Sequence, residues 1–494
     1  MTSAPAAHRI GAVLGWNYGG ALASVLLQLG YTAWTARTAS HGAFGAYAIG
    51  LTLTQLLGLF AQAGLATCVL RSVRLTRAEL RAAQRIALVT GLVCCVLAEV
   101  AAPLPARLFA LPELTLALRV LGLQFLLLPL GTVLLAALRR EGRPRQATVA
   151  ELTGQVAGCV VSVALLSRDA GPAALAANPP VAALVTYAVA RASAASLQLV
   201  QGDAVRALPL IRLSGFLTLF ALTRSLAGNA PLWCAGRLLG PGAAGLYSRA
   251  QLLADVPLNV MVKGLNQAAV PALAERRGQG REIRTAAGTL VDSASVGLLA
   301  FGALAGAGPA ALGLLLGPGW EGAADLVPAL SLLAALQLLY AAGCSLDLAR
   351  GARRAMGTHQ AAVLVVTAAG LLLAWRWPSP VLVVGAAVAG LTAGHTLQLV
   401  AWRRAGLIEL PTALRSHAVH ATAGFCLALS GGWGAARFPG GAALPAALLA
   451  MVPVAAVLWL LRDQVPAYRA ARRLGLIRAP RPRTEKEEPA CVSP

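Results

Sequence analysis

Residues Arg237–Tyr247 read RLLGPGAAGLY, and residues Arg37–Tyr47, two hundred positions earlier, read RTASHGAFGAY. An arginine, a Gly-Ala pair, a second glycine and a tyrosine recur in register. The match continues into the flanking apolar segments, where Gly64–Leu65 corresponds to Gly264–Leu265. A fixed offset over this length predicts a duplicated half and not a short repeat. In membrane proteins, two related halves commonly hold the substrate site between them, near the bilayer midplane.

The composition places the chain in a membrane. Of its 494 residues, 57% are hydrophobic and only 12% are charged. Many apolar runs reach the ~20 residues that cross a hydrocarbon core of ~30 Å. The formal net charge of +22 would favour a nucleic-acid partner in a soluble domain, but here the arginines form short clusters between apolar segments. We read these clusters as topology signals and expect no nucleic-acid partner.

The apolar pattern predicts an all-α integral membrane protein with about 14 transmembrane helices. Backbone that faces lipid must satisfy its own hydrogen bonds, and the segments lack the alternation of barrel strands, so helices are required. The expected spans lie at about residues 11–36, 43–70, 86–110, 114–138, 147–167, 179–200, 214–239, 243–273, 286–316, 324–349, 359–376, 379–402, 417–437 and 441–461.

The repeat divides these helices into two pseudo-repeated lobes of six. We expect an N-terminal transmembrane lobe at 1–212 and a C-terminal transmembrane lobe at 213–404, followed by two additional helices at 405–461 and a basic cytoplasmic tail at 462–494. Basic clusters follow the even-numbered segments, so the positive-inside rule predicts that both termini are cytoplasmic. The opposite loops, such as 38–42 and 317–322, are very short, which leaves no room for an extracellular domain.

The cysteines give no sign of a metal site. Seven of the eight lie inside apolar segments, where free cysteine packs as a small apolar residue. No CxxC or Cys/His ligand spacing appears, so we expect neither a metal nor a cofactor.

The eighth segment carries most of the intramembrane polar groups. Gln251, Asp255, Asn259, Lys263 and Gln267 follow one another at four-residue spacing. Such a spacing keeps side chains on one slowly rotating helix face. A charge inside a span is costly, at ~2.5–3.5 kcal/mol at the helix centre, so these groups are candidates for function. We expect them to line a common wet surface.

Further polar groups complete the candidate site. The seventh segment adds Arg224 and Asn229, and Arg249 lies beside the stripe. Cations in a poorly hydrated cleft suit a phosphate or pyrophosphate. The candidate substrate-binding residues are therefore Arg224, Arg249, Lys263, Asn229, Asn259 and Gln251.

Other interpretations of these charges remain open. Arg224 and Arg249 each lie a few turns from a membrane surface and could snorkel to it. Asp255 and Lys263, two turns apart, could form a purely structural ion pair. Asp255 and Glu99 are also candidates for ion coupling, by binding a proton or a cation.

The repeated turn has an architectural interpretation. Gly-Pro-Gly at 240–242 favours a tight reversal between two helices. Gly242 and Gly245 would permit close helix approach, and Tyr247 would fit the aromatic belt at the membrane interface.

The sequence resembles the polysaccharide transporters, or lipid-linked oligosaccharide flippases, of the multidrug/oligosaccharidyl-lipid/polysaccharide (MOP) superfamily. The resemblance covers roughly residues 11–404 and consists of packing and turn motifs. The stretches that carry it are Leu239–Tyr247, Val270–Leu273, Leu314–Ala323, Phe44–Tyr47 and Ala63–Leu65.

This resemblance implies two six-helix lobes around a central cavity that opens alternately to either side. The expected function is a flippase of the bacterial cytoplasmic membrane that moves a polyprenyl-pyrophosphate-linked oligosaccharide for surface polysaccharide synthesis, without bond chemistry. Its partners would be this substrate, membrane lipids, and a polysaccharide polymerase and glycosyltransferases. The alternatives are an ion-coupled drug or metabolite antiporter of the same superfamily and, from another class, a membrane glycosyltransferase or polymer ligase. The short outer loops disfavour an enzyme.

Overall fold

A computed structural model describes residues 4–62, 65–71, 75–168, 171–197, 208–275 and 280–462, together with residues 466 and 468. Its elements in these ranges are helices, and ten helices or runs of helices are long and apolar enough to cross a membrane. The all-α membrane fold is therefore confirmed, while the number of fourteen spans stays a prediction. Gly64 of the repeat and nearly all of the predicted basic tail lie outside the described residues.

The first half of the chain forms one helical bundle. Prolines split two of its predicted spans: Pro103 begins a new helix at the end of the third, and Pro129 lies at the start of α7. A proline lacks the N–H that would continue a helix and is tolerated in the first turn. The elements are α1 (Ala4–Ala36), α2 (His41–Gln62), α3 (Leu65–Arg71), α4 (Arg77–Ala101), α5 (Pro103–Phe109), α6 (Glu113–Gly122), η1 (Leu123–Leu126), α7 (Leu128–Arg140), α8 (Pro144–Leu166), α9 (Gly171–Ala176) and α10 (Asn178–Ala194).

The second half forms another bundle, with two further helices beside it. The predicted boundary at 212/213 falls near the start of α11 and stays a prediction. The elements are α11 (Leu208–Leu238), α12 (Pro241–Glu275), α13 (Gly280–Leu316), α14 (Glu321–Ala324), α15 (Val327–Arg350), α16 (Arg353–Arg376), α17 (Pro380–Arg404), α18 (Leu410–Arg437), η2 (Gly440–Ala442) and α19 (Ala443–Leu460).

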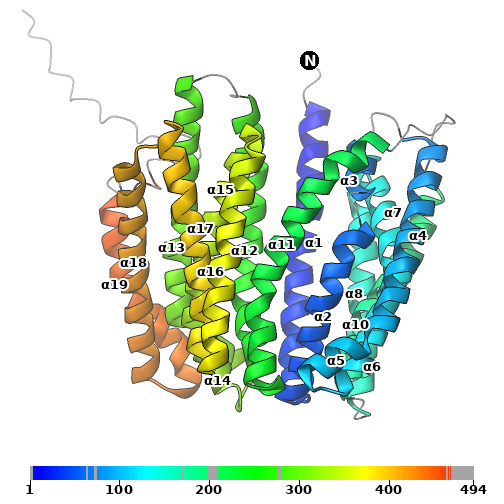
Figure 1. Cartoon of the computed structure of the whole chain (residues 1–494), viewed down its shortest axis with the longest axis horizontal. Coiled ribbons are helices and arrows are strands. Elements are labelled where there is room, and N and C mark those ends of the chain that lie inside the picture. Colours follow the sequence, from blue (N-terminus) through cyan, green and yellow to red (C-terminus); the bar gives the residue numbers. More distant parts are fainter. Residues whose placement is uncertain are drawn as a thin grey trace, which may run out of the picture.

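The two bundles stand side by side, touch at one end and diverge toward the other (Figure 1). We call the touching end, with α14 and the turns at 37–40 and 239–240, the closed end. The other end, where α1 begins, we call the basic end, because arginines gather at the helix termini there. Examples are Arg139 and Arg140 at the end of α7 and Arg403 and Arg404 at the end of α17.

The repeated motif forms the contact between the bundles. A Cβ atom on Gly45 would overlap the carbonyl of Pro241, and one on Gly245 would overlap the carbonyl of His41. Because positions 41 and 241 correspond in the repeat, each copy of the motif packs against the other in the same way. Gly245 therefore permits the close approach that its position predicted. Gly242 contributes less, since the nearest atom to its Cβ would be 4.0 Å away.

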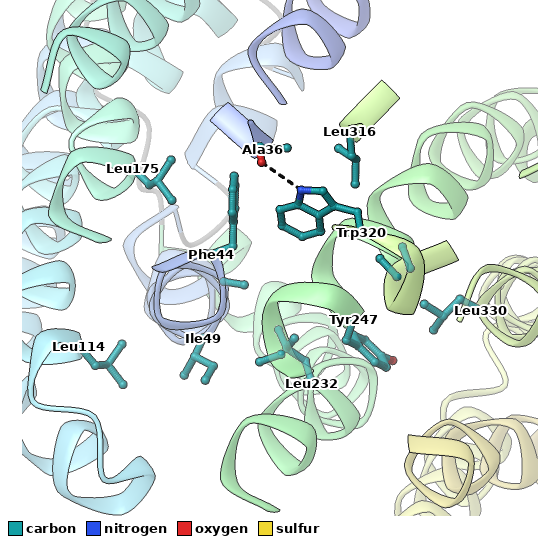
Figure 2. Close-up of a cluster of buried hydrophobic side chains, with 14 of the residues drawn as sticks. Ala36, Phe44, Ile49, Leu114, Leu175, Leu232, Tyr247, Leu316, Trp320 and Leu330 are labelled. Carbon is teal, nitrogen blue, oxygen red and sulfur yellow. Dashed lines mark hydrogen bonds between the residues drawn. The ribbon is translucent and has the colours of Figure 1, made fainter. Parts of the chain in front are cut away.

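Tyr247 departs from its predicted place in an interfacial aromatic belt. Its side chain is only 2% exposed and belongs to the hydrophobic core at the closed end. The interpretation as a belt residue was wrong, because this face of α12 packs inside the second bundle, where the ring of Tyr247 points toward Leu330 of α15 (Figure 2).

Trp320 joins the two halves at the same end. Its indole Nε1 donates a hydrogen bond to the carbonyl of Ala36 at 3.0 Å, and the ring lies edge-on to Phe44, as Figure 2 shows. The His41 ring packs against it as well, with ring centroids 4.4 Å apart. Trp233 Nε1 adds a second hydrogen bond between the halves, 2.8 Å from Thr52 Oγ1. Buried aromatic packing and hydrogen bonds thus lock the closed end.

The two additional helices pack on the second bundle through glycines. A Cβ on Gly302 of α13 would overlap the backbone of Gly424 in α18, and one on Gly306 would lie 2.8 Å from two carbonyl oxygens of α18. Small residues let membrane helices approach closely where no hydrophobic effect drives them together. Helix α18 is therefore joined tightly to α13, although it lies outside the predicted six-helix lobe.

The glycine crossing is the first feature to test. We expect Gly45→Ala and Gly245→Ala to lower the melting temperature in detergent, at a cost of about 1–3 kcal/mol each, because the added methyl meets backbone that cannot move aside. Gly42→Ala and Gly242→Ala are matched controls, since they lie one turn earlier in more open positions. Equal melting temperatures for all four variants would contradict the close contact.

Candidate functional site

A polar cavity lies inside the second bundle, among α11, α12, α15, α16 and α17. Its volume is about 240 Å³. Apolar side chains such as Leu258, Leu333 and Leu391 form part of its wall. The polar lining consists of Arg224, Asn229, Gln251, Asp255, Asn259, Gln337, Tyr340, Gln360 and Thr367.

The cavity contains five of the eight residues that the sequence singled out. Gln251, Asp255 and Asn259 reach it from α12, which their four-residue spacing explains, and Arg224 and Asn229 reach it from α11. The structure thus brings together the polar stripe of one helix and the polar pair of the preceding one.

Lys263 and Arg249 lie outside this lining. Lys263 follows Asn259 by one turn, and its side chain is exposed. Arg249 lies between the two bundles, where its guanidinium carbon is 4.6 Å from the centroid of the Phe44 ring in α2. Its Nε donates to Ser248 Oγ at 3.5 Å, and a stack on an aromatic face does not use the terminal guanidinium N–H groups.

Glu99 lies in the other bundle. Its carboxylate is 3.9 Å from the guanidinium Nε of Arg119, and both side chains are at least one-third exposed. An exposed pair of this kind contributes little to stability. Glu99 therefore has a local partner and does not belong to the cavity.

Four lining residues were missed by sequence reasoning: Gln337, Tyr340, Gln360 and Thr367. They lie on α15 and α16, and the Tyr340 hydroxyl donates to Gln360 Oε1 at 3.0 Å. Each of them is a polar residue within an apolar span, but none is ionisable at neutral pH and none lies on a helix that carries the repeat. Glutamine and threonine are common enough in spans that only their convergence on one space marks them.

The cavity combines one arginine and one carboxylate with five side-chain amides. Among the described residues, no ion pair within 4.0 Å joins Asp255 to Arg224, Arg249 or Lys263, so the structural ion pair between Asp255 and Lys263 is not formed there. Asn229 is held by its own helix, since its Nδ2 donates to the Ser225 carbonyl at 2.9 Å. Amides offer donors and acceptors to hydroxyl groups, and an unpaired guanidinium suits a phosphate.

The part of the chain that the structure describes holds no cluster of three or more histidine, cysteine, aspartate or glutamate side chains that could hold a metal ion.

Comparisons with known proteins give the family. A family model described as "Polysaccharide biosynthesis protein" matches residues 35–325. The succinoglycan biosynthesis transport protein ExoT of Rhizobium meliloti (strain 1021) is 31% identical over 313 residues. That match covers 60% of this chain and 60% of the relative, so the aligned region spans about three-fifths of either protein.

Solved structures resemble the fold at low sequence identity. The lipid II flippase MurJ in an inward closed conformation has a TM-score of 0.62 at 11% identity, covering 92% of this chain and 99% of that one. A multidrug resistance MATE family transporter of the MOP superfamily, in an inward-facing conformation, has a TM-score of 0.57 at 16% identity, covering 78% and 94%. At these identities the likeness concerns the fold alone.

The family model matches more than half of the chain and includes both copies of the repeated motif, the helices α11 and α12 and Trp320. This chain belongs to the polysaccharide biosynthesis protein family and has the fold of the MOP superfamily transporters.

Proposed function

We propose that this protein is a flippase that moves a polyprenyl-pyrophosphate-linked oligosaccharide across the cytoplasmic membrane of a bacterium for surface polysaccharide synthesis. The observation that carries the proposal is the cavity in the second bundle, where Arg224 and five amide side chains face a common space inside a transporter fold. The similarity to a succinoglycan transport protein supports the polysaccharide pathway.

The size of the cavity limits what it can hold. At about 240 Å³ it is smaller than the ~300–1,000 Å³ typical of drug-sized ligand sites, so it does not enclose a whole oligosaccharide. It suits one phosphate or one sugar unit, with Arg224 for the anion and amides for hydroxyl groups. The rest of the head group would occupy the region between the bundles, beside Arg249 and Lys263, and the polyprenyl tail would stay in lipid.

The proposed transport cycle needs no bond chemistry. The basic end faces the cytoplasm by the positive-inside rule, which places both termini and the tail at 462–494 there. The closed end then faces the outside. The lobes at 1–212 and 213–404 would rock against each other, so that the Trp320 and glycine contacts open when the substrate leaves. A polymerase and glycosyltransferases would act before and after this step.

Asp255 supports one second candidate, an ion-coupled antiporter of the same superfamily. Its carboxylate lines the same cavity as Arg224 and has no cationic partner within 4.0 Å among the described side chains. A carboxylate in such a space could exchange a proton or a cation. The cavity has as many cations as anions, however, which fits a cationic drug less well than an amphoteric head group.

The native substrate can be identified by depletion. We expect cells that lose this protein to accumulate a lipid-linked saccharide on the cytoplasmic face of the membrane, because synthesis would continue without translocation. Mass spectrometry of extracted lipids, with and without a membrane-impermeant glycosidase, locates and identifies it. Depletion without any such accumulation would remove the flippase proposal.

The cations of the proposed substrate site can be tested in proteoliposomes. We expect Arg224→Gln and Arg249→Gln each to slow translocation of the lipid-linked sugar at least about tenfold, since hydrogen bonds to charged groups are worth ~1.5–3 kcal/mol. Arg376→Gln is the matched control, because Arg376 ends the cavity helix α16 but is exposed against Trp377. Unchanged translocation in the triple variant Arg224→Gln, Arg249→Gln and Lys263→Gln would refute the site.

The hydrogen bond between Trp320 and Ala36 at the closed end leads to a further prediction. Trp320→Phe keeps an aromatic ring but removes the hydrogen bond to Ala36, so we expect a larger population open at this end. Spin labels at the exposed residues Thr38 and Pro318 would show a longer distance component by pulsed electron paramagnetic resonance. Trp375→Phe, at an exposed indole of α16, should leave the distribution as in the parent; the same distribution in both variants would argue against a lock.

A further inference from the structure

A second polar cluster lies between α13, α17 and α18, outside the cavity. His395 of α17 and His417 of α18 face each other, with their Nε2 atoms 3.1 Å apart. His395 is only 7% exposed. The pair joins an additional helix to the core of the bundle, and nothing in the proposed substrate site uses it.

Hydrogen bonds determine which nitrogen of each ring carries a proton. The amide of Gln398 directs its Nε2 to the carbonyl of Tyr340, at 3.3 Å, and its Oε1 to His395 Nδ1, at 3.2 Å. An acceptor facing Nδ1 requires a proton there, so the neutral His395 ring has a bare Nε2. His417 must then donate from its own Nε2, which leaves His417 Nδ1 bare in the neutral pair.

On the far side of His417, a single hydroxyl hydrogen faces two acceptors. Ser295 Oγ lies 2.7 Å from His417 Nδ1 and also 2.7 Å from the carbonyl of Val291. The single hydroxyl hydrogen cannot serve both acceptors. One added proton resolves the conflict: protonated Nδ1 donates to Ser295, and Ser295 donates to Val291.

A second added proton has no place in the pair. It would have to occupy His395 Nε2, which would set two N–H groups against each other at 3.1 Å and bring two cations together. The hydrogen-bond pattern therefore accommodates zero or one extra proton, shared by the two rings as a coupled unit.

The cluster also reaches the wall of the cavity. Gln398, which contacts His395, lies over Gly343 of α15, where a Cβ would overlap its amide. In the space left by the missing side chain of Gly343, Gln398 Nε2 donates to the carbonyl of Tyr340. The Tyr340 hydroxyl in turn donates to the cavity residue Gln360. Two hydrogen bonds thus connect Gln398 through Tyr340 to the cavity residue Gln360.

The surroundings contain other titratable groups. On α18, His420 binds the Ser416 carbonyl through Nδ1 at 2.7 Å, and Asp292 of α13 lies near it. On α15, Cys344 contacts Gln398, and Asp347 accepts from Trp402 Nε1 of α17 at 2.9 Å while facing Arg350 and, on α16, His359. Asp347 thus has its own partners, whereas His395 and His417 are hydrogen-bonded directly to each other.

We propose that His395 and His417 form a one-proton binding site, and that its occupancy is coupled to transport through Gln398 and Tyr340. The coupling part rests on the proposed function, whereas the proton site does not. The proton binds at His417 Nδ1, and both rings keep their hydrogen bond through Nε2. Ionisable groups inside a membrane bundle are commonly functional, and a histidine pair switches by gaining or losing a single charge.

Nitrogen NMR of the ¹⁵N-histidine-labelled protein tests the site without substrate. The chain has six histidines, so single His→Gln variants assign the signals. At neutral pH we expect His395 protonated on Nδ1 and His417 on Nε2. As the pH is lowered from about 8 to about 4, the two should shift together with uptake of one proton. Opposite tautomers, uptake of two protons, or titration of either ring unaffected by loss of the other would overturn the site.

Flipping assays test the coupling. We expect the pH dependence of translocation in proteoliposomes to be largely lost in His395→Gln and His417→Gln. The matched control His420→Gln, a buried histidine on the same helix but outside the pair, should retain it. The same pH profile in all variants would overturn the coupling. Absence of translocation at every pH in the parent protein, with one-proton uptake seen by NMR, would refute the proposed function and leave the proton site standing.

Discussion

Two helix backbones meet at Gly45 and Gly245, and the arrangement of both bundles depends on this contact. A side chain at either position would push α2 away from α12. Gly45 meets Pro241 and Gly245 meets His41, and positions 41 and 241 correspond in the repeat. The contact is therefore nearly symmetric, as expected where two related copies of one unit pack together. Trp320 and the hydrophobic core around it then complete the closed end, and the bundles diverge from there (Figure 1).

The interiors of the two bundles differ, although their contact is nearly symmetric. The second bundle carries a polar cavity where α11 and α12 bring together Arg224, Asp255 and several amides. In the first bundle, α1 is instead held to α8 by neutral pairs, such as Tyr31 with Ser162 and Ser24 with Gln155. Under the proposed function, this uneven distribution of charge would let one lobe bind the head group while the other lobe moves against it.

Much of the fold was predictable because membrane helices must be long, apolar and internally hydrogen-bonded. The same local logic located the stripe on α12, since four-residue spacing on a helix defines a face. Helix periodicity gave wrong predictions where the environment of a helix face depends on the neighbouring helices. Tyr247 was predicted to lie in the interfacial aromatic belt but is buried in the hydrophobic core at the closed end. Lys263, on the polar stripe of α12, lies outside the cavity lining. A helix pattern states which residues share a face, but not what the face meets.

The sequence by itself determined the class of protein, the approximate spans and the duplicated motif, because these follow from composition and periodicity along one helix at a time. Only the tertiary structure decided which polar residues converge. Gln337 and Gln360 join Arg224 in one space, and His395 meets His417 across a helix pair that the repeat does not include. Such meetings depend on how far each helix is rotated and on where glycine lets two backbones approach, which is settled by packing between segments distant in sequence.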